Sequence, residues 1–111
     1  IRSVDPLLRA SDAGRAIFVT SGVAKGVFPY WAAYSASKGA LEMLAYTYAA
    51  ENQKTGIRVN VLDPGVVRTD MRAQAFPGED PMTLPDPDSI TERFVKLAEP
   101  SFGKTGQRYT V

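Results

Sequence analysis

A tyrosine and a lysine stand four residues apart, as Tyr34 and Lys38, near the start of a long helix-forming segment. On one helix, side chains with this spacing share a face, and their Cβ atoms lie about 5–6 Å apart. An ammonium group beside a phenol favours the ionised phenolate, which makes the phenol usable as an acid and base near neutral pH. The pair therefore indicates proton-transfer chemistry.

Two other segments could complete such a site. Ser21 lies in Thr20-Ser-Gly22, directly after one strand-like run, and Pro64-Gly65 follows another. Because open parallel sheets bind ligands beyond the carboxyl ends of their strands, we expect both segments to meet the Tyr34–Lys38 pair at one edge of a sheet. The Ser21 hydroxyl could hold a substrate oxygen beside the phenol. Each segment alone is also typical of an ordinary turn or of chance spacing.

The composition excludes several function classes. The chain has no cysteine and no histidine, which excludes disulfides, metal sites built on those residues and serine–histidine hydrolases. No metal site is expected, so a redox step needs an organic cofactor. The net charge of +1 gives no electrostatic reason to expect nucleic acid or an anionic membrane as a partner. No apolar stretch reaches the roughly 18 residues of a membrane span. The lack of cysteine fits a reducing compartment, and we expect a cytoplasmic location.

The surrounding segments predict how these groups are positioned. A chain of 111 residues allows one domain at most. The continuous apolar run Ala16–Val19 predicts a strand covered on both faces, and residues 57–62 predict a second strand. Residues 31–54 contain no proline and are rich in helix formers, so we expect a long helix with Gly56 as its C-terminal stop. Together these segments form a parallel βαβ unit.

The strand Ala16–Val19 is expected at an edge of a sheet of three parallel strands. A bare apolar edge strand promotes aggregation. We therefore expect a neighbour for it: an upstream segment, a second chain or a domain-swapped partner. Ahead of this strand, residues 1–13 predict a helix tail with a bend or a helix end at Pro6.

The segment after the second strand is a long proline-rich connection. Residues 64–88 hold five prolines, and connections of this length are usually functional lids or disordered. A short helix is expected over residues 66–75. Ser89-Ile-Thr-Glu92 is a capping-box pattern that predicts a helix over residues 89–98. Residues 106–111 predict the last strand.

Taken together, these motifs resemble the C-terminal half of a short-chain dehydrogenase/reductase. The Tyr-x-x-x-Lys signature of that family matches Tyr34-Ser-Ala-Ser-Lys38, and its catalytic serine falls on Ser21, thirteen residues earlier. Arg58-Val-Asn-Val-Leu-Asp-Pro64-Gly65-Val-Val-Arg-Thr69 matches the family's strand and Pro-Gly-x-Val-x-Thr cofactor loop. The match spans most of residues 14–70. The stretch from Met71 to Pro81 is also similar to a bacterial subgroup of uncharacterised members.

The resemblance implies a fold and an activity. The fold is α/β, part of a doubly wound parallel sheet of the Rossmann type, with residues 1–111 as the C-terminal half of one domain whose N-terminal half is absent. The activity is hydride transfer between a ketone or aldehyde and an alcohol, with NAD or NADP as cofactor. Residues 66–88 then form the loop that covers a small carbonyl or alcohol substrate. In the family, the helices that correspond to residues 1–10 and 31–54 often form a dimer contact, so a homo-oligomer is implied.

The resemblance also assigns roles to single residues. Tyr34 is the general acid and base at the substrate oxygen, and Ser21 orients that oxygen. Lys38 favours the phenolate and binds hydroxyls of the nicotinamide ribose. The cofactor carboxamide is met by Thr69 and by the backbone of Val67. The cofactor-binding residues implied are Tyr34, Lys38, Pro64, Gly65, Val67 and Thr69.

Parts of the family's machinery have no counterpart in this chain. The Gly-rich dinucleotide turn, the residue that selects NAD or NADP and the family's catalytic asparagine all lie upstream in relatives. The isolated chain is therefore expected to be incomplete and inactive, because it could not hold a pyrophosphate on a helix N-terminus. The alternative is a half-domain that has lost catalysis and serves as an interaction or scaffold module. The presence of Ser21, Tyr34 and Lys38 together favours the enzyme.

Overall fold

The computed structural model describes all of residues 1–111, and it contains the three strands and the flanking helices that the sequence predicts. Short 3₁₀ helices lie at Gly22–Lys25 (η1), Pro81–Thr83 (η2) and Pro87–Ile90 (η3). The main elements are α1 (Asp5–Ala10), β1 (Arg15–Val19), α2 (Ala32–Glu51), β2 (Arg58–Asp63), α3 (Asp70–Ala75), α4 (Thr91–Ala98) and β3 (Arg108–Thr110).

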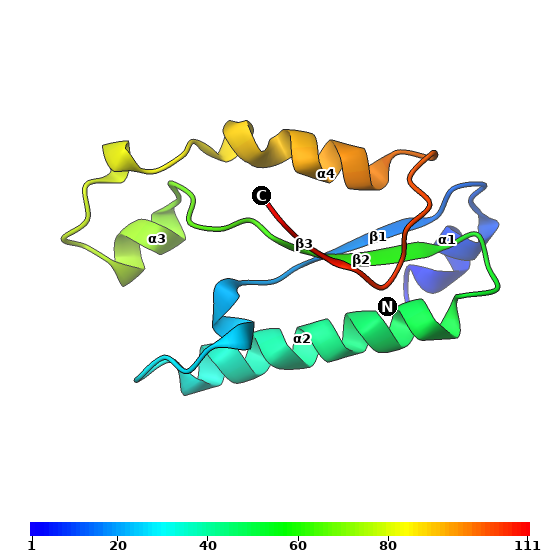
Figure 1. The fold of residues 1–111 in the computed structure, drawn as a ribbon, viewed down its shortest axis with the longest axis horizontal. Coiled ribbons are helices and arrows are strands. Elements are labelled where there is room, and N and C mark those ends of the chain that lie inside the picture. The colour runs from blue at the N-terminus through cyan, green and yellow to red at the C-terminus, as the bar shows by residue number, and fades with distance from the viewer.

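The sheet is parallel throughout and has the order β1-β2-β3. Its register places Val61 of β2 between Phe18 of β1 and Arg108 of β3. Helix α2 runs along one face of the sheet and α4 along the other (Figure 1). The predicted α/β fold is confirmed, including the position of β1 at an edge of the sheet.

The core lies between β2 and the C-terminal half of α2. Val59 and Val61 of β2 are at most 1% exposed, and Ala45 and Ala49 of α2 belong to the same buried cluster. Burial of each such Val side chain stabilises the fold by about 1.5–3 kcal/mol. Because the core is made by α2 and the central strand, it holds the helix that carries Tyr34 and Lys38 in a fixed position.

Strand β1 is less buried than its apolar sequence predicts. All five of its residues are half-buried or exposed, and Val19 is 40% exposed. Helices contact both of its faces, but its outer edge has no strand beside it. The expected cover on both faces is therefore only partial within these 111 residues.

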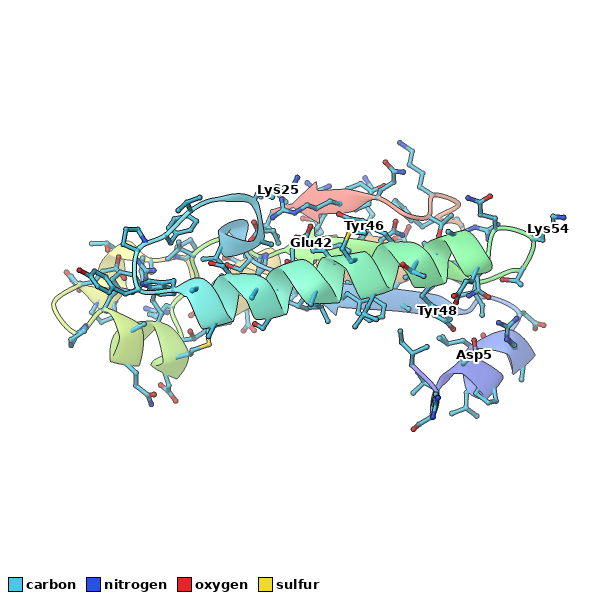
Figure 2. The ribbon with its side chains drawn as sticks, turned by 90° about the horizontal axis from the view of Figure 1, so that it is seen from below. Asp5, Lys25, Glu42, Tyr46, Tyr48 and Lys54 are labelled. Atoms are coloured by element: carbon cyan, nitrogen blue, oxygen red, sulfur yellow. The ribbon has the colours of Figure 1, made fainter.

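Helix α1 is shorter than the predicted segment 1–13 and packs beside the C-terminal end of α2. Pro6 lies in its first turn, where the missing N–H removes no helical hydrogen bond, so it neither bends nor ends the helix. Tyr48 of α2 donates a 2.7 Å hydrogen bond to Asp5 (Figure 2). Burial, together with the Asp5 carboxylate, raises the pKa of Tyr48 to about 12.

Glycine is required at position 14, in the turn between α1 and β1. A Cβ there would lie 2.5 Å from the Leu8 carbonyl oxygen, so only glycine allows the turn to lie this close to α1.

The predicted C-terminal end of α2 is wrong by three residues. The helix ends at Glu51 rather than Lys54, and Gly56 is not the residue that ends it. Asn52 occupies the C-cap, and its side-chain amide donates to the Tyr48 carbonyl at 2.9 Å. The Asn52 side chain and the backbone N–H groups of Asn52 and Gln53 thus satisfy carbonyl groups of the last turn, and no left-handed glycine is needed.

The elements near residues 64–98 also differ from the prediction in their starting points. Helix α3 begins at Asp70 because the Thr69 hydroxyl accepts the Arg72 N–H as an N-cap. The capping box at Ser89 does not form: Ser89 lies in η3 and donates to the Asp86 carbonyl at 2.6 Å. Helix α4 starts at Thr91 without a side-chain cap.

None of the helices has the length and apolarity needed to span a membrane.

Candidate active site

Tyr34 and Lys38 lie on the first half of α2, on the face that meets the end of β1. The Lys38 Nζ donates a 3.1 Å hydrogen bond to the carbonyl oxygen of Val19, the last residue of β1. The same nitrogen lies 5.8 Å from the centre of the Tyr34 ring. The predicted sharing of one helix face is thus observed. An ammonium group has three protons, so two remain on Lys38 for other acceptors.

Ser21 lies immediately beyond β1 as the N-cap of η1. Its Oγ accepts the Val23 N–H at 3.4 Å, which leaves the hydroxyl proton free for another partner. The helix η1 packs against α2, so the end of β1 and the first half of α2 are neighbours. No hydrogen bond joins Ser21 to Tyr34, and the Tyr34 hydroxyl has no hydrogen-bond partner within the chain.

The Pro64–Thr69 segment begins at the carboxyl end of β2, on the same edge of the sheet. Asp63 Oδ1 accepts the Gly65 N–H at 3.0 Å and fixes the turn. Gly65 has φ of +69°, which favours glycine, and no atom lies within 4 Å of where its Cβ would be. Val67 is 8% exposed and anchors the segment to the core. The Thr69 hydroxyl caps α3 as an acceptor and keeps its own proton.

An aromatic cluster joins the segment 66–88 to the start of α2. The Trp31 ring lies 5.8 Å from the Tyr34 ring and 5.7 Å from the Phe76 ring, centre to centre. The Arg72 guanidinium covers Phe76 at 3.6 Å and is held by Glu79 through two hydrogen bonds of 2.6 and 2.7 Å. The proline-rich connection is thus packed next to Tyr34. Trp31, three residues before Tyr34, was a signal that the sequence analysis did not use.

A buried polar network lies one turn further along α2. Glu42, four residues after Lys38, is 7% exposed and accepts a 2.7 Å hydrogen bond from the Thr20 hydroxyl. Glu42 and Tyr46 lie on the same side of α2 (Figure 2). Burial acts to raise the pKa of Glu42, but the hydrogen bonds from Thr20 and Arg108 outweigh it, and the net pKa is lowered. The sequence analysis missed this network, although a carboxylate four residues after Lys38 was a visible signal.

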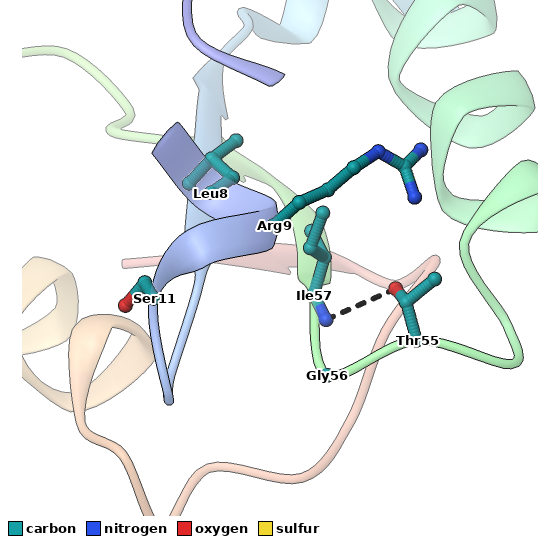
Figure 3. Close-up of a pocket in the computed structure, with 6 residues that line it drawn as sticks. All are labelled: Leu8, Arg9, Ser11, Thr55, Gly56 and Ile57. Carbon is teal, nitrogen blue, oxygen red and sulfur yellow. Dashed lines mark hydrogen bonds between the residues drawn. The ribbon is translucent and has the colours of Figure 1, made fainter. Parts of the chain in front are cut away.

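A pocket elsewhere in the molecule contains none of the predicted site residues. It has a volume of about 160 Å³ and opens between α1 and the turn before β2 (Figure 3). This is the amino end of the strands, opposite to the edge at which parallel sheets bind ligands. Its lining residues are Leu8, Arg9, Ser11, Thr55, Gly56 and Ile57.

Comparison with known proteins identifies relatives of the chain. The family model described as short chain dehydrogenase matches residues 1–80. The uncharacterized oxidoreductase YciK of Escherichia coli K12 is 43% identical over 105 residues, which cover 94% of this chain and 41% of that protein. This chain also matches two solved structures, and each match covers 98% of this chain and 45% of the chain in that structure. One is a short chain dehydrogenase from Salmonella enterica serovar Typhi (TM-score 0.93, 40% identity), and the other is an Escherichia coli CFT073 protein complexed with NADPH (TM-score 0.92, 41% identity).

These relatives confirm the predicted resemblance, including the similarity to a bacterial subgroup. The chain spans less than half the length of the relatives named above. The family match includes Ser21, Tyr34, Lys38 and the Pro64–Thr69 segment, because it extends through residue 80. On this evidence, the chain belongs to the short chain dehydrogenase family.

Proposed function

We propose that this chain carries the proton-transfer half of an NAD(P)-dependent oxidoreductase that interconverts a ketone or aldehyde and an alcohol. The observation that carries the proposal is the Lys38 contact to the end of β1, with Tyr34 on the same helix face. This contact fixes the ammonium beside the phenol at the edge of the sheet where ligands bind. The proposal assigns catalysis to Ser21, Tyr34 and Lys38.

Each of the three side chains has a distinct task. Tyr34 donates a proton to the substrate oxygen in reduction and removes it in oxidation. Ser21, whose hydroxyl proton is free, donates to the same oxygen and orients it. Lys38 holds its positive charge near the Tyr34 ring and binds the cofactor ribose with its remaining protons. When bound, the nicotinamide group supplies or accepts the hydride.

The residues present fit such a cofactor. The open space beside Gly65 admits a ligand close to the backbone, and the Thr69 hydroxyl keeps a proton to donate. The proposed cofactor-binding residues are therefore Tyr34, Lys38, Pro64, Gly65, Val67 and Thr69. Among the relatives, the Escherichia coli CFT073 structure contains NADPH, and a structure from Shigella flexneri contains NADP. The cofactor proposed is NAD or NADP.

The site is proposed to be completed by residues outside this chain. The open edge of β1 and the partial coverage of the relatives support residues 1–111 as the C-terminal half of one domain, with residues 66–88 as its substrate loop. We call the proposed longer protein the full-length parent. A homo-oligomer through α1 and α2 also stays a prediction, supported by Leu7, Met43 and Leu44, which are 70%, 62% and 57% exposed. The cytoplasmic location stays a prediction.

Replacing Lys38 in the full-length parent tests the proposal. Lys38→Met is expected to lower kcat for NADPH-linked carbonyl reduction by about 10²-fold, because the proton-transfer site loses the positive charge beside Tyr34. The Kd for NADPH, measured by fluorescence titration, is expected to rise about tenfold, since one charge-assisted hydrogen bond is lost. The matched control is Lys25→Met, which removes an exposed lysine of η1 that forms no ion pair. If Lys38→Met behaves like this control, the role given to Lys38 is wrong.

A further inference from the structure

One largely enclosed guanidinium contacts all three segments of the proposed site. Arg108, at the start of β3, donates from Nε to Glu42 Oε1 at 3.1 Å and from Nη2 to Asp63 Oδ2 at 2.8 Å. The same Nη2 lies 3.4 Å from the Ser21 carbonyl oxygen. The side chains of Arg108, Glu42 and Asp63 are only 13%, 9% and 10% exposed, so these bonds form away from bulk water.

The two carboxylates extend these contacts to the catalytic groups. Glu42 lies four residues after Lys38, one turn along the same face of α2, and also accepts the Thr20 hydroxyl at 2.7 Å. Asp63 accepts the Gly65 N–H at 3.0 Å and thereby fixes the turn that opens the Pro64–Thr69 segment. A shift of Arg108 would therefore move the catalytic helix, the end of β1 and the cofactor segment relative to one another.

We propose that Arg108 is a positioning residue that holds Ser21, the Tyr34–Lys38 helix and the Gly65 turn in one fixed arrangement. This inference rests on the proposed function. Arg108 acts through Glu42 and Asp63 and does not itself meet the reacting atoms. A displacement of about 1 Å between catalytic groups costs about 10²-fold in rate, which sets the size of the expected effect.

The charges of the network explain why the guanidinium is needed. Without Arg108, two carboxylates remain buried with no cation between them, and removing one partner of a buried ion pair leaves an uncompensated charge. The other groups that face the carboxylates are the Tyr46 hydroxyl, which donates to Glu42 at 3.3 Å, and the neutral Thr20 hydroxyl. Lys25 of η1 forms no ion pair with either carboxylate.

The test uses the full-length parent with Arg108→Met, an uncharged side chain of similar length. We expect kcat for NADPH-linked carbonyl reduction to fall about 10²-fold, with the KM of the carbonyl substrate changed less than about threefold, because alignment in the transition state is lost. The melting temperature is expected to fall by on the order of 10 °C. Arg108→Lys keeps the charge but lacks the planar guanidinium whose separate Nε and Nη2 atoms bond Glu42 and Asp63. Its kcat is expected to lie between those of the wild type and Arg108→Met.

Two matched variants separate positioning from general stability. Arg58→Met removes a guanidinium that bonds main-chain carbonyls at the amino end of β2, and it is expected to leave kcat unchanged. The triple variant Arg108→Met/Glu42→Gln/Asp63→Asn removes the buried charges together with the cation. Its melting temperature is expected to recover most of the decrease seen in Arg108→Met, while its kcat stays about 10²-fold below that of the wild type. Wild-type kcat in the triple variant, or equal losses of kcat in Arg58→Met and Arg108→Met, overturns the inference.

The pH profile is a second readout that a purely structural role would not move. In Arg108→Met, burial is no longer opposed by the guanidinium, so the pKa of Glu42 rises and the carboxylate protonates at higher pH. The acid limb of the kcat profile is therefore expected to move to higher pH in Arg108→Met. This shift is expected to be absent from the triple variant, which has no Glu42 carboxyl group to titrate. An unchanged acid limb contradicts the inference. If Tyr34→Phe also keeps full activity, the proposed function fails as well; if Tyr34→Phe is inactive, only the role of Arg108 fails.

Discussion

Tyr34→Phe in the full-length parent is expected to lower kcat for carbonyl reduction by about 10²- to 10⁴-fold, the range of a lost general acid. The substitution removes only the hydroxyl. That hydroxyl has no hydrogen-bond partner within the chain, and the ring that contacts Trp31 is kept. The melting temperature is therefore expected to stay close to that of the wild type. A large loss of kcat without a loss of stability is the signature of a group that acts in the chemical step.

Tyr109→Phe is the matched control for this prediction. The Tyr109 hydroxyl is also without a partner, but it is buried on β3 and lies outside the proposed site. Its removal is expected to leave kcat and stability unchanged. Turnover by Tyr34→Phe within about twofold of the wild type would mean that another group is the acid and base.

Residues 1–111 produced alone are expected to bind NADPH at least about 10³-fold more weakly than the full-length parent. The chain offers contacts at the nicotinamide end but has no Gly-rich turn to receive the pyrophosphate. Loss of about 4 kcal/mol of binding free energy corresponds to this factor. Fluorescence titration of both proteins with NADPH measures the ratio.

The same titration separates the enzyme from the scaffold alternative. Tight binding of NADPH by the full-length parent together with weak binding by residues 1–111 supports the view that residues 1–111 form only part of the cofactor-binding domain. If the full-length parent also fails to bind NADPH, the cofactor role is wrong and an interaction module becomes the better account. Binding of equal strength by both proteins would show that the missing segment does not contribute to the cofactor site.

Patterns among neighbouring residues were sufficient to predict most strands and the long helix, but not the helix ends. The apolar and helix-forming runs correctly placed β1, β2 and α2, because burial and helix propensity act over several neighbouring residues. The predicted helix ends failed where a single polar side chain decided them. Asn52 ended α2 before Gly56 was reached, and Thr69 set the start of α3.

The polar network around Arg108 could not be predicted in the same way. Its bonds join residues that are 66 and 45 positions apart in the sequence, and Arg108 carries no motif of its own. Only the parallel register, which brings β3 beside the end of β2, places its guanidinium between Glu42 and Asp63. Tyr34 and Lys38 were visible because their relation is local to one helix turn. The bond from Lys38 to Val19 again required the three-dimensional fold.

The most direct test of the central claim is a crystal structure of the full-length parent with NADP and a bound alcohol or ketone. The account predicts that the Tyr34 hydroxyl and the Ser21 hydroxyl both lie about 2.6–3.2 Å from the same ligand oxygen. It also predicts that the Lys38 ammonium reaches the ribose hydroxyls. A ligand oxygen more than about 6 Å from Tyr34, with the phenol directed into a different part of the molecule, would contradict the account, since direct proton transfer needs hydrogen-bond contact.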